Sequence, residues 1–315
     1  MESNWTENNF FRFIKKTLNH IKIPGLHGLG LYDLLKIFIE GLINGFIGPR
    51  AAAVSYSLFM SLFPFVIFLF SLLPQFELAD DLQRVFEQTV LARIFPDNSA
   101  NLTTSLDSIL GEKNLTILST GFLLSIIFTT NGINALISGF NLTYHKLEKR
   151  HFIRQYFIAL ILTIIFTLLF ILMLFIIYYA SPLSRYIEER QMRYISNYSD
   201  LISGGLASTL TIATFFLGVS LLYKYGPKTK FSFKEILPGA IFATLLFILS
   251  FWGFGVYIKY FAQYKTLYNS LGTILILMLW IYINVIIILT GFELNATFYV
   301  TKRLRSDQIR DELKS

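Results

Sequence analysis

The chain has 315 residues, of which 54% are hydrophobic and only 15% charged, and its mean hydropathy is positive. Globular domains carry about 25% charged residues, so this composition excludes an ordinary soluble domain and indicates a membrane protein. Cysteine is absent, which excludes disulfides, thiolate metal sites and cysteine nucleophiles. The formal net charge of +7 could suit nucleic acid, but the placement of the charges argues against that partner.

The amino-terminal residues 1–30 are predicted to be a cytoplasmic segment. The first nine residues are polar and acidic, with no basic region ahead of an apolar core, so we expect no cleavable signal peptide.

Residues 31–48 are predicted to form an amphipathic helix. Asp33, Lys36, Glu40 and Asn44 recur at spacings of three, four and four, which places them on one helical face. Charges this frequent argue against a membrane crossing, so we expect an interfacial helix on the cytoplasmic leaflet. We expect Gly48-Pro49 to end it. A helix buried at the base of the bundle is the alternative.

Residues 49–299 are predicted to form an all-α membrane domain with six crossings. Each apolar segment is long enough to span a bilayer, which takes roughly 20 residues at a 1.5 Å rise. The six segments are about 52–73, 116–140, 156–180, 203–223, 237–258 and 271–299. Residues 300–315 are predicted to be a cytoplasmic tail.

The distribution of Lys and Arg predicts the orientation. Of the 27 basic residues, 19 lie in the two terminal segments and in the second and fourth loops, and eight lie in the other loops. The positive-inside rule then places both termini in the cytoplasm, which requires an even number of crossings. The net charge is explained by topology and by attraction to anionic lipid headgroups, so membrane lipids are the expected partners and nucleic acid is not.

Two outer loops carry amphipathic or aromatic patterns. Residues 74–114 mix acidic side chains with apolar ones at near-helical spacing, which predicts a short helix capping the outer mouth. Residues 181–200 are predicted to be a loop whose tyrosines lie at headgroup level.

An acidic residue in the last crossing is the main candidate for function. Glu293 follows an apolar run from about 271 to 289, and an ionisable side chain there usually faces a partner or a watery cavity. Topology places Arg50, at the start of the first crossing, at a similar depth. We expect the two to pair, either as a structural salt bridge or as a site for a headgroup, ion or proton. Asn295 lies about 200° round the helix and faces another way.

Other polar residues within the crossings could line the same site. Ser55 and Tyr56 lie just inside the first crossing, and Pro64 is expected to kink it. In the second crossing Asn131, Asn134, Ser138 and Asn141 form one polar stripe. Hydrogen bonding between helices and lining of a cavity are both consistent with that stripe.

No catalytic constellation is recognisable. The four histidines, all in predicted cytoplasmic segments, lack metal-ligand spacing, and nucleotide and hydrolase motifs are absent. We therefore expect no cofactor, no metal site and no enzyme activity, with a membrane enzyme as the alternative.

Several short motifs are spread over most of the chain. They are Arg50-Ala-Ala-Ala-Val-Ser-Tyr56, Ser61-Leu-Phe-Pro64, Pro238-Gly239-Ala240, Tyr268-Asn-Ser-Leu-Gly272, Leu279-Trp-Ile-Tyr282 and Gly291-Phe-Glu-Leu-Asn-Ala296. In sequence and in order they resemble the YihY/virulence factor BrkB family. Asn269 and Phe292 depart from the family's common Gly and Ala, which concerns only local packing.

The resemblance implies a multi-pass protein of the bacterial cytoplasmic (inner) membrane with six crossings. Some members are linked to serum resistance or envelope lipid traffic, and many carry a ribonuclease BN label that the residues here do not support. A transporter or lipid-translocating protein of unknown substrate is the leading hypothesis. A non-transporting scaffold or envelope-assembly factor is the alternative, and a homo-oligomer or an envelope partner protein could take part, with small residues such as Gly253 and Gly255 permitting dimerisation.

Overall fold

A computed structural model describes residues 31–72, 115–143, 151–189, 199–261 and 265–312. Within these ranges the chain forms helices and no strand, which confirms the all-α membrane class. The helices are α2 (Leu31–Asn44), α3 (Ile47–Leu72), α7 (Leu115–Asn141), α8 (Phe152–Glu189), α10 (Ser199–Tyr225), α11 (Phe233–Phe261) and α12 (Lys265–Glu312). The predicted outer-loop helix in residues 74–114 and the segment 1–30 lie outside the described residues.

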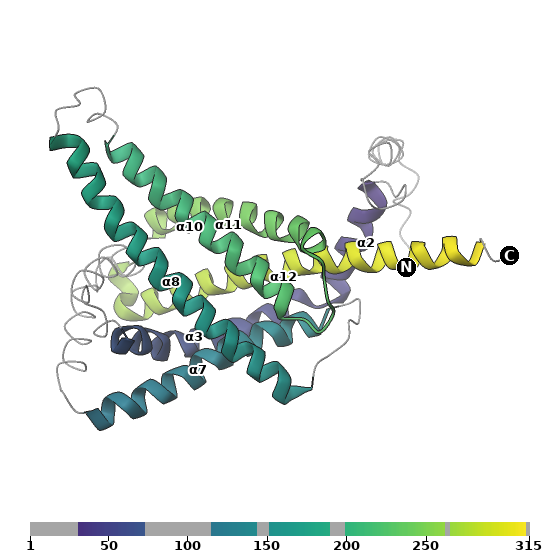
Figure 1. Cartoon of the computed structure of the whole chain (residues 1–315), viewed down its shortest axis with the longest axis horizontal. Coiled ribbons are helices and arrows are strands. Elements are labelled where there is room, and N and C mark those ends of the chain that lie inside the picture. The colour runs from purple at the N-terminus through teal and green to yellow at the C-terminus, as the bar shows by residue number, and fades with distance from the viewer. Residues whose placement is uncertain (1–30, 73–114, 144–150, 190–198, 262–264, 313–315) are drawn as a thin grey trace.

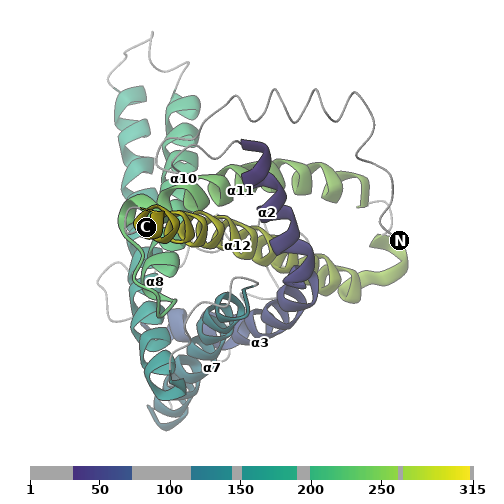
Figure 2. The ribbon, with the colours of Figure 1, turned by 90° about the vertical axis from the view of Figure 1, so that its right-hand side faces the viewer.

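Helix α12 runs through the middle of the bundle (Figure 1). Viewed nearly along its axis, it is surrounded by α2, α3, α7, α8, α10 and α11 (Figure 2). It packs directly on α11, α3 and α2, while α7 packs between α3 and α8, and α10 packs between α8 and α11. The last helix therefore contacts both the first part of the chain and its immediate predecessor.

Four of the described helices contain a segment long and apolar enough to cross a membrane. These segments are Leu123–Asn141, Phe152–Ile176, Phe233–Tyr257 and Ile274–Arg303. A fifth is obtained if the bent pair Leu34–Asn44 and Ile47–Phe65 counts as one span. Helix α10, which carries many Ser, Thr and Gly residues, is not among them. The count of six crossings and the cytoplasmic termini thus stay predictions.

Two helices are longer than their predicted crossings. Helix α8 continues to Glu189, so residues 181–189 are helical and the predicted loop there is wrong over those residues. Helix α12 continues to Glu312, so most of the predicted tail is helical as well. The predicted boundaries mark where the apolar residues end. The helices continue past them, because charged residues such as Lys, Arg and Glu allow the backbone hydrogen bonds of a helix to go on.

The junction between α2 and α3 corrects the predicted helix end. The chain bends by 59° between these helices, and Phe46 takes a left-handed backbone conformation with φ of 50°, which is uncommon for a residue other than glycine. The break therefore lies at Gly45-Phe46 rather than at Gly48-Pro49. Pro49 lies in the first turn of α3, where its missing N–H costs no helical hydrogen bond.

Helix α2 is packed on one side only. Leu34 and Phe38 are buried, and the Phe38 ring meets Phe242 of α11 edge-on at 6.1 Å. On the other side Lys36 and Glu40 are exposed and form an ion pair of 3.8 Å. The helix is thus not enclosed by the bundle, and its interfacial position remains a prediction.

An aromatic cluster fills the interior where α7, α10 and α12 meet. Phe292 is fully buried, 4.4 Å from the ring of Phe140 and 5.7 Å from that of Tyr223. Phe231, from the turn before α11, packs edge-on against Phe292 at 6.0 Å. Phe292, a departure from the family pattern, thus fills space in the core.

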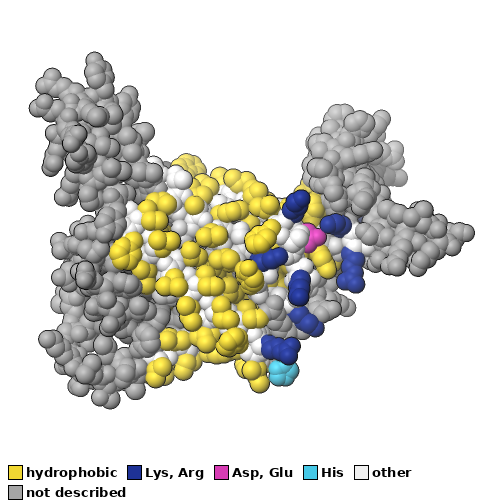
Figure 3. Space-filling view, viewed as in Figure 1, with side chains coloured by type: hydrophobic (Ala, Val, Ile, Leu, Met, Phe, Trp, Pro, Cys, Tyr) yellow, Lys and Arg dark blue, Asp and Glu magenta, His cyan; other side chains and the backbone are white. Residues whose placement is uncertain are grey.

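The basic side chains that Figure 3 colours gather at one end of the described part of the chain, at the edge of a broad apolar surface. Those described there include Arg154, Lys228, Lys230, Lys234, Lys302 and Arg303, all exposed. Apolar side chains such as Ile164, Leu168, Leu249 and Trp252 are exposed on the helices beyond them. An apolar band with a basic edge is the arrangement expected of a protein held in a bilayer.

Candidate functional site

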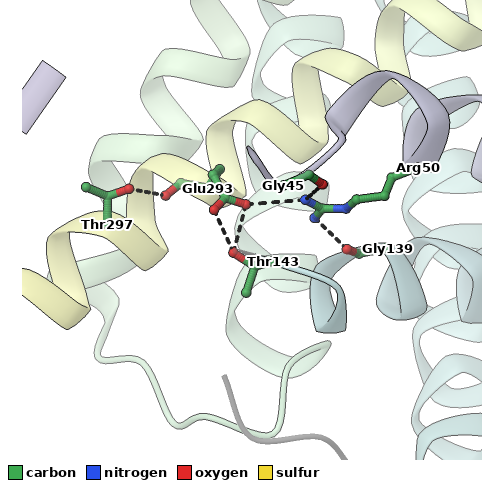
Figure 4. A network of polar contacts seen from close by, with 6 residues as sticks. All are labelled: Gly45, Arg50, Gly139, Thr143, Glu293 and Thr297. Carbon is green, nitrogen blue, oxygen red and sulfur yellow. Dashed lines mark hydrogen bonds and ion pairs between the residues drawn. The ribbon is translucent and has the colours of Figure 1, made fainter. Parts of the chain in front are cut away.

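Arg50 and Glu293 meet inside the bundle. The Nη1 atom of Arg50 lies 3.6 Å from Oε2 of Glu293, and the side chains are only 6% and 0% exposed (Figure 4). Arg50 comes from the first turn of α3, and Glu293 from α12, which packs beside it. The contact between Arg50 and Glu293 that topology predicts is therefore confirmed.

Two carbonyl groups at helix ends hold the guanidinium of Arg50. Its Nη1 donates to the oxygen of Gly45 at 3.1 Å, and its Nη2 donates to the oxygen of Gly139 at 2.6 Å. Gly45 directly follows α2, and Gly139 lies in the last turn of α7. The carboxyl ends of helices carry partial negative charge, so three negative groups surround one cation. The left-handed residue Phe46 follows Gly45 directly.

The hydroxyl of Thr143 lies 2.7 Å from each carboxylate oxygen of Glu293. Helix α7 ends at Asn141, and the N–H of Thr143 then donates to the oxygen of Phe140 at 3.1 Å. This tight final turn brings the hydroxyl to the carboxylate (Figure 4). The pair therefore joins α3 and α12 to the carboxyl ends of α2 and α7.

The opposite side of α12 is fixed to α11. The side chain of Asn295 accepts from the N–H of Gly239 at 2.7 Å and donates to the oxygen of Ile236 at 3.0 Å. This confirms that Asn295 points away from Glu293. Pro238 lies between Ile236 and Gly239 in the same turn of α11, so the amide of Asn295 binds the backbone on both sides of the proline.

Gly239 and Gly291 let α11 and α12 touch through their backbones. A Cβ placed on Gly239 would lie 2.1 Å from the oxygen of Gly291, and one on Gly291 would lie 2.7 Å from the oxygen of Gly239. No side chain fits at either position. The stretch Gly291-Phe-Glu-Leu-Asn-Ala296 therefore holds α12 on two sides, by an ion pair on one and by a backbone contact and an amide on the other.

The polar stripe of α7 is bound by one residue of α8. Gln155 Nε2 donates to Asn134 at 2.8 Å and to Ser138 at 2.9 Å, and Gln155 Oε1 accepts from Asn141 at 2.6 Å. These contacts favour the interpretation of the stripe as hydrogen bonding between helices. They also separate Asn134 and Ser138 from the Arg50–Glu293 pair.

Three other candidate residues do not join the pair. Tyr56 is 57% exposed, because it lies six residues after Arg50 and so about 240° round α3. Ser55 is buried but donates to the oxygen of Ala51 in its own helix. Asn131 is exposed, since it lies about 10 Å along α7 from Ser138, beyond the reach of Gln155. Helix α3 continues through Pro64.

Sequence reasoning missed the groups that complete the site. Gly45 and Gly139 contribute through backbone oxygens, for which a sequence gives no direct signal. Thr143 follows the predicted second crossing, and Gln155 precedes the third, so both lay at boundaries treated as loops. The sequence signal for Thr143 and Gln155 is that each is a polar side chain directly beside the apolar run of a predicted crossing.

The sequence profile described as virulence factor BrkB matches residues 45–313. The chain belongs to this family. It is similar to the putative ribonuclease-like protein YfkH of Bacillus subtilis, with 30% identity over 264 residues, which covers 81% of this chain and 91% of the relative.

Other BrkB relatives are named as membrane proteins. A UPF0761 membrane protein of Pseudoalteromonas translucida is 26% identical over 264 residues, covering 82% of this chain and 83% of the relative. One of Idiomarina loihiensis is 26% identical over 272 residues, covering 86% and 91%. No solved structure matches the chain. The chain is therefore a multi-pass membrane protein of the BrkB family.

The ribonuclease-like name belongs to the Bacillus relative. Within the described residues of this chain, no group of three or more His, Asp or Glu side chains could hold a metal ion. His151 is exposed, and His20, His27 and His145 lie outside the described ranges. That the chain is not an enzyme stays a prediction.

Proposed function

We propose that this BrkB family member is a transporter of the bacterial cytoplasmic membrane that moves an anionic lipid or similar amphiphile. In this proposal the Arg50–Glu293 pair closes the basic end of the bundle. The observation that carries the proposal is the fully buried carboxylate of Glu293, paired with Arg50 across separate helices. Ionisable residues within a membrane bundle commonly mark the route of a substrate or ion.

Energetics favour a working role over simple packing. Replacing a buried ion pair by apolar residues of similar volume is often neutral or stabilising, whereas breaking it is costly. Apolar side chains could therefore hold α3 against α12 equally well. The pair joins elements from both ends of the chain, so its opening would remove the polar contacts that tie α12 to α3 and to the carboxyl ends of α2 and α7.

The substrate class follows from the charges at the same end. Exposed lysines and arginines lie along one edge of the apolar surface there (Figure 3), and they attract anionic headgroups. The guanidinium of Arg50 keeps an Nε atom without a hydrogen-bond partner among the described residues, so it retains capacity to bind a phosphate. Arginine is well suited to that group.

A scaffold is the second candidate, and one observation favours it. The amide of Gln155 in α8 binds both Asn134 and Asn141 of α7, which joins the two helices through polar side chains. A bundle whose polar groups are paired internally can hold partners without moving lipid. A measurement of lipid movement therefore distinguishes a transporter from a scaffold.

The test is lipid movement in reconstituted vesicles. The full chain is incorporated into vesicles that contain fluorescent phosphatidylglycerol or phosphatidylethanolamine, and quenching from outside reports the transfer between leaflets. We expect the wild type to accelerate transfer of the anionic lipid. Glu293→Gln is expected to lower that rate by about tenfold, the size of a 1.4 kcal/mol effect. The ion pair that closes the basic end of the bundle can no longer form in this variant.

Glu235→Gln is the matched control, because Glu235 pairs with Lys302 at 3.2 Å at the molecular surface. Its transfer rate should equal that of the wild type. Wild-type vesicles no faster than protein-free ones would exclude lipid transport and leave the scaffold. Equal rates for wild type and Glu293→Gln would remove the carboxylate from the mechanism.

A further inference from the structure

One side of α7 is left exposed by the rest of the described chain. The helix lies at the edge of the bundle (Figure 1 and Figure 2), where it packs on α3 and α8. Leu124, Ile127 and Phe128 on this side are 54%, 49% and 46% exposed, and Asn131, one turn further on, is exposed as well. A polar amide thus lies on an otherwise apolar surface.

The amide of Asn131 lies deep in the predicted membrane region. The candidate span of α7 runs from Leu123 to Asn141, and Asn131 is about 15 Å along the helix from its end at Asn141. The hydrocarbon core of a bilayer is about 30 Å thick, so this amide is near its centre. Lipid tails offer no hydrogen bond, and an amide unsatisfied there is costly.

The structure gives the side chain of Asn131 no hydrogen bond within the described residues. The neighbouring amides of the stripe, by contrast, are bound by Gln155 of α8. Asn131 therefore needs a partner from outside the described part of the chain.

The exposed side of α7 also has the spacing of a contact between two parallel helices. Five positions, which we call the α7 seam, recur alternately four and three residues apart, and none of them is buried: Leu124, Phe128, Asn131, Ala135 and Ser138. Such alternation lets two helices pack side by side over several turns. The small side chains of Ala135 and Ser138 permit a close approach in a membrane.

The chemistry of the amide favours a second copy of this chain as the partner. Asparagine carries both donors and an acceptor, so two asparagines can satisfy each other. Copies of a membrane protein share one orientation, so two α7 helices meet in parallel, with Asn131 at the same depth in each. A single asparagine in such a seam sets the register of the pair.

We propose that α7 of a second copy packs on the α7 seam, and that the two Asn131 side chains exchange hydrogen bonds across a two-fold axis. Apolar side chains give little net drive for association within lipid, so the amides select this contact. The inference goes beyond the proposed function and does not rest on it, because a transporter and a scaffold can both be dimeric.

Cysteine cross-linking in native membranes tests the contact. The chain contains no cysteine, so Phe128→Cys provides a single thiol in the seam, one turn from Asn131. Leu249→Cys is the matched control on the exposed side of α11, where the side chain is 64% exposed. After the same mild oxidation we expect about tenfold more disulfide-linked dimer from Phe128→Cys, because only the seam holds two thiols close enough to bond.

The dissociation constant of the purified chain, measured in detergent by energy transfer between labelled copies, tests the amide itself. Asn131→Leu is expected to raise it by about tenfold, because two hydrogen bonds between membrane helices are lost. Asn131→Gln, which keeps an amide, should remain close to the wild type. Both variants should fold, since the side chain is exposed.

Three results would overturn the proposal. They are a monomeric wild type, a dissociation constant that Asn131→Leu leaves unchanged, and cross-linking of Leu249→Cys equal to or stronger than that of Phe128→Cys. The last result would assign the contact to α11, beside Gly253. Each leaves the measurement of lipid movement unaffected, so the two proposals fail separately.

Discussion

Gly239→Ala is expected to lower the melting temperature of the protein by about 5 °C, which corresponds to roughly 3 kcal/mol for a chain of this size. The added Cβ would lie 2.1 Å from the backbone oxygen of Gly291 and 2.6 Å from the amide of Asn295. A backbone oxygen cannot turn aside as a flexible side chain can. Helix α11 would have to separate from α12, and Asn295 would lose its two hydrogen bonds.

The measurement is thermal unfolding of the purified chain in detergent. Gly253→Ala and Gly255→Ala are matched controls in the same helix, because nothing lies within 4 Å of a Cβ at either position. Alanine is a better helix former than glycine by about 1 kcal/mol, so these controls should melt at or slightly above the wild-type temperature. If Gly239→Ala melted together with them, the close contact between α11 and α12 would be refuted.

Arg50→Gln is expected to destabilise the protein by about 3–5 kcal/mol, because it removes the positive charge that lies 3.6 Å from the buried carboxylate of Glu293. Glu293→Gln should cost less, since glutamine can still bond to Thr143 and Arg50 keeps two carbonyl partners. The double variant should be more stable than the sum of the single effects predicts. A double-mutant cycle on melting temperatures in detergent measures this coupling.

The exposed pair Lys36–Glu40 is the control for that cycle. Its ion pair measures 3.8 Å, but its side chains are 63% and 51% exposed, so solvent screens the interaction and the coupling should be under about 0.5 kcal/mol. A coupling free energy between Arg50 and Glu293 no larger than this value would mean that the two charges do not interact measurably.

The sequence predicted those parts of the site that follow from topology and helical period. An acid near the inner end of the last crossing and an arginine at the start of the first had to lie at similar depth, and they do. The two-residue spacing of Glu293 and Asn295 placed them on different sides of α12. The shared depth of Arg50 and Glu293 follows from the direction in which each helix crosses the membrane. The different sides of Glu293 and Asn295 follow from the regular period of a helix.

What the sequence could not predict depends on how helices end. Thr143 reaches Glu293 because of the turn that closes α7, and Gly45 offers its oxygen beside the left-handed Phe46. Hydrophobicity carries no information on such geometry. The polar stripe of α7 was recognised, but its partner Gln155 belongs to a helix whose angle to α7 is set by packing. Tyr56 was assigned by proximity in sequence and lies on the other side of α3.

The region from Gly291 to Ala296 is most informative when taken as one unit. Gly291 and Asn295 fix α12 to α11, while Glu293 between them binds the opposite helices. If the pair opens, the contact with α11 remains.

Accessibility of position 143 tests most directly whether this pair opens. The chain contains no cysteine, so Thr143→Cys provides a single thiol at a site that is only 4% exposed. Its labelling rate is measured with a membrane-impermeant maleimide applied to the basic side in native membranes. The exposed position Lys228→Cys is the control and should label rapidly in every background.

The account predicts slow labelling of Thr143→Cys alone and labelling about tenfold faster when Glu293→Gln is added, because loss of the carboxylate releases α12 from Arg50. Equally slow labelling in both backgrounds, with Lys228→Cys still labelled rapidly, would show that the pair is a fixed structural contact. That result would contradict the proposal that the pair opens and closes during transport.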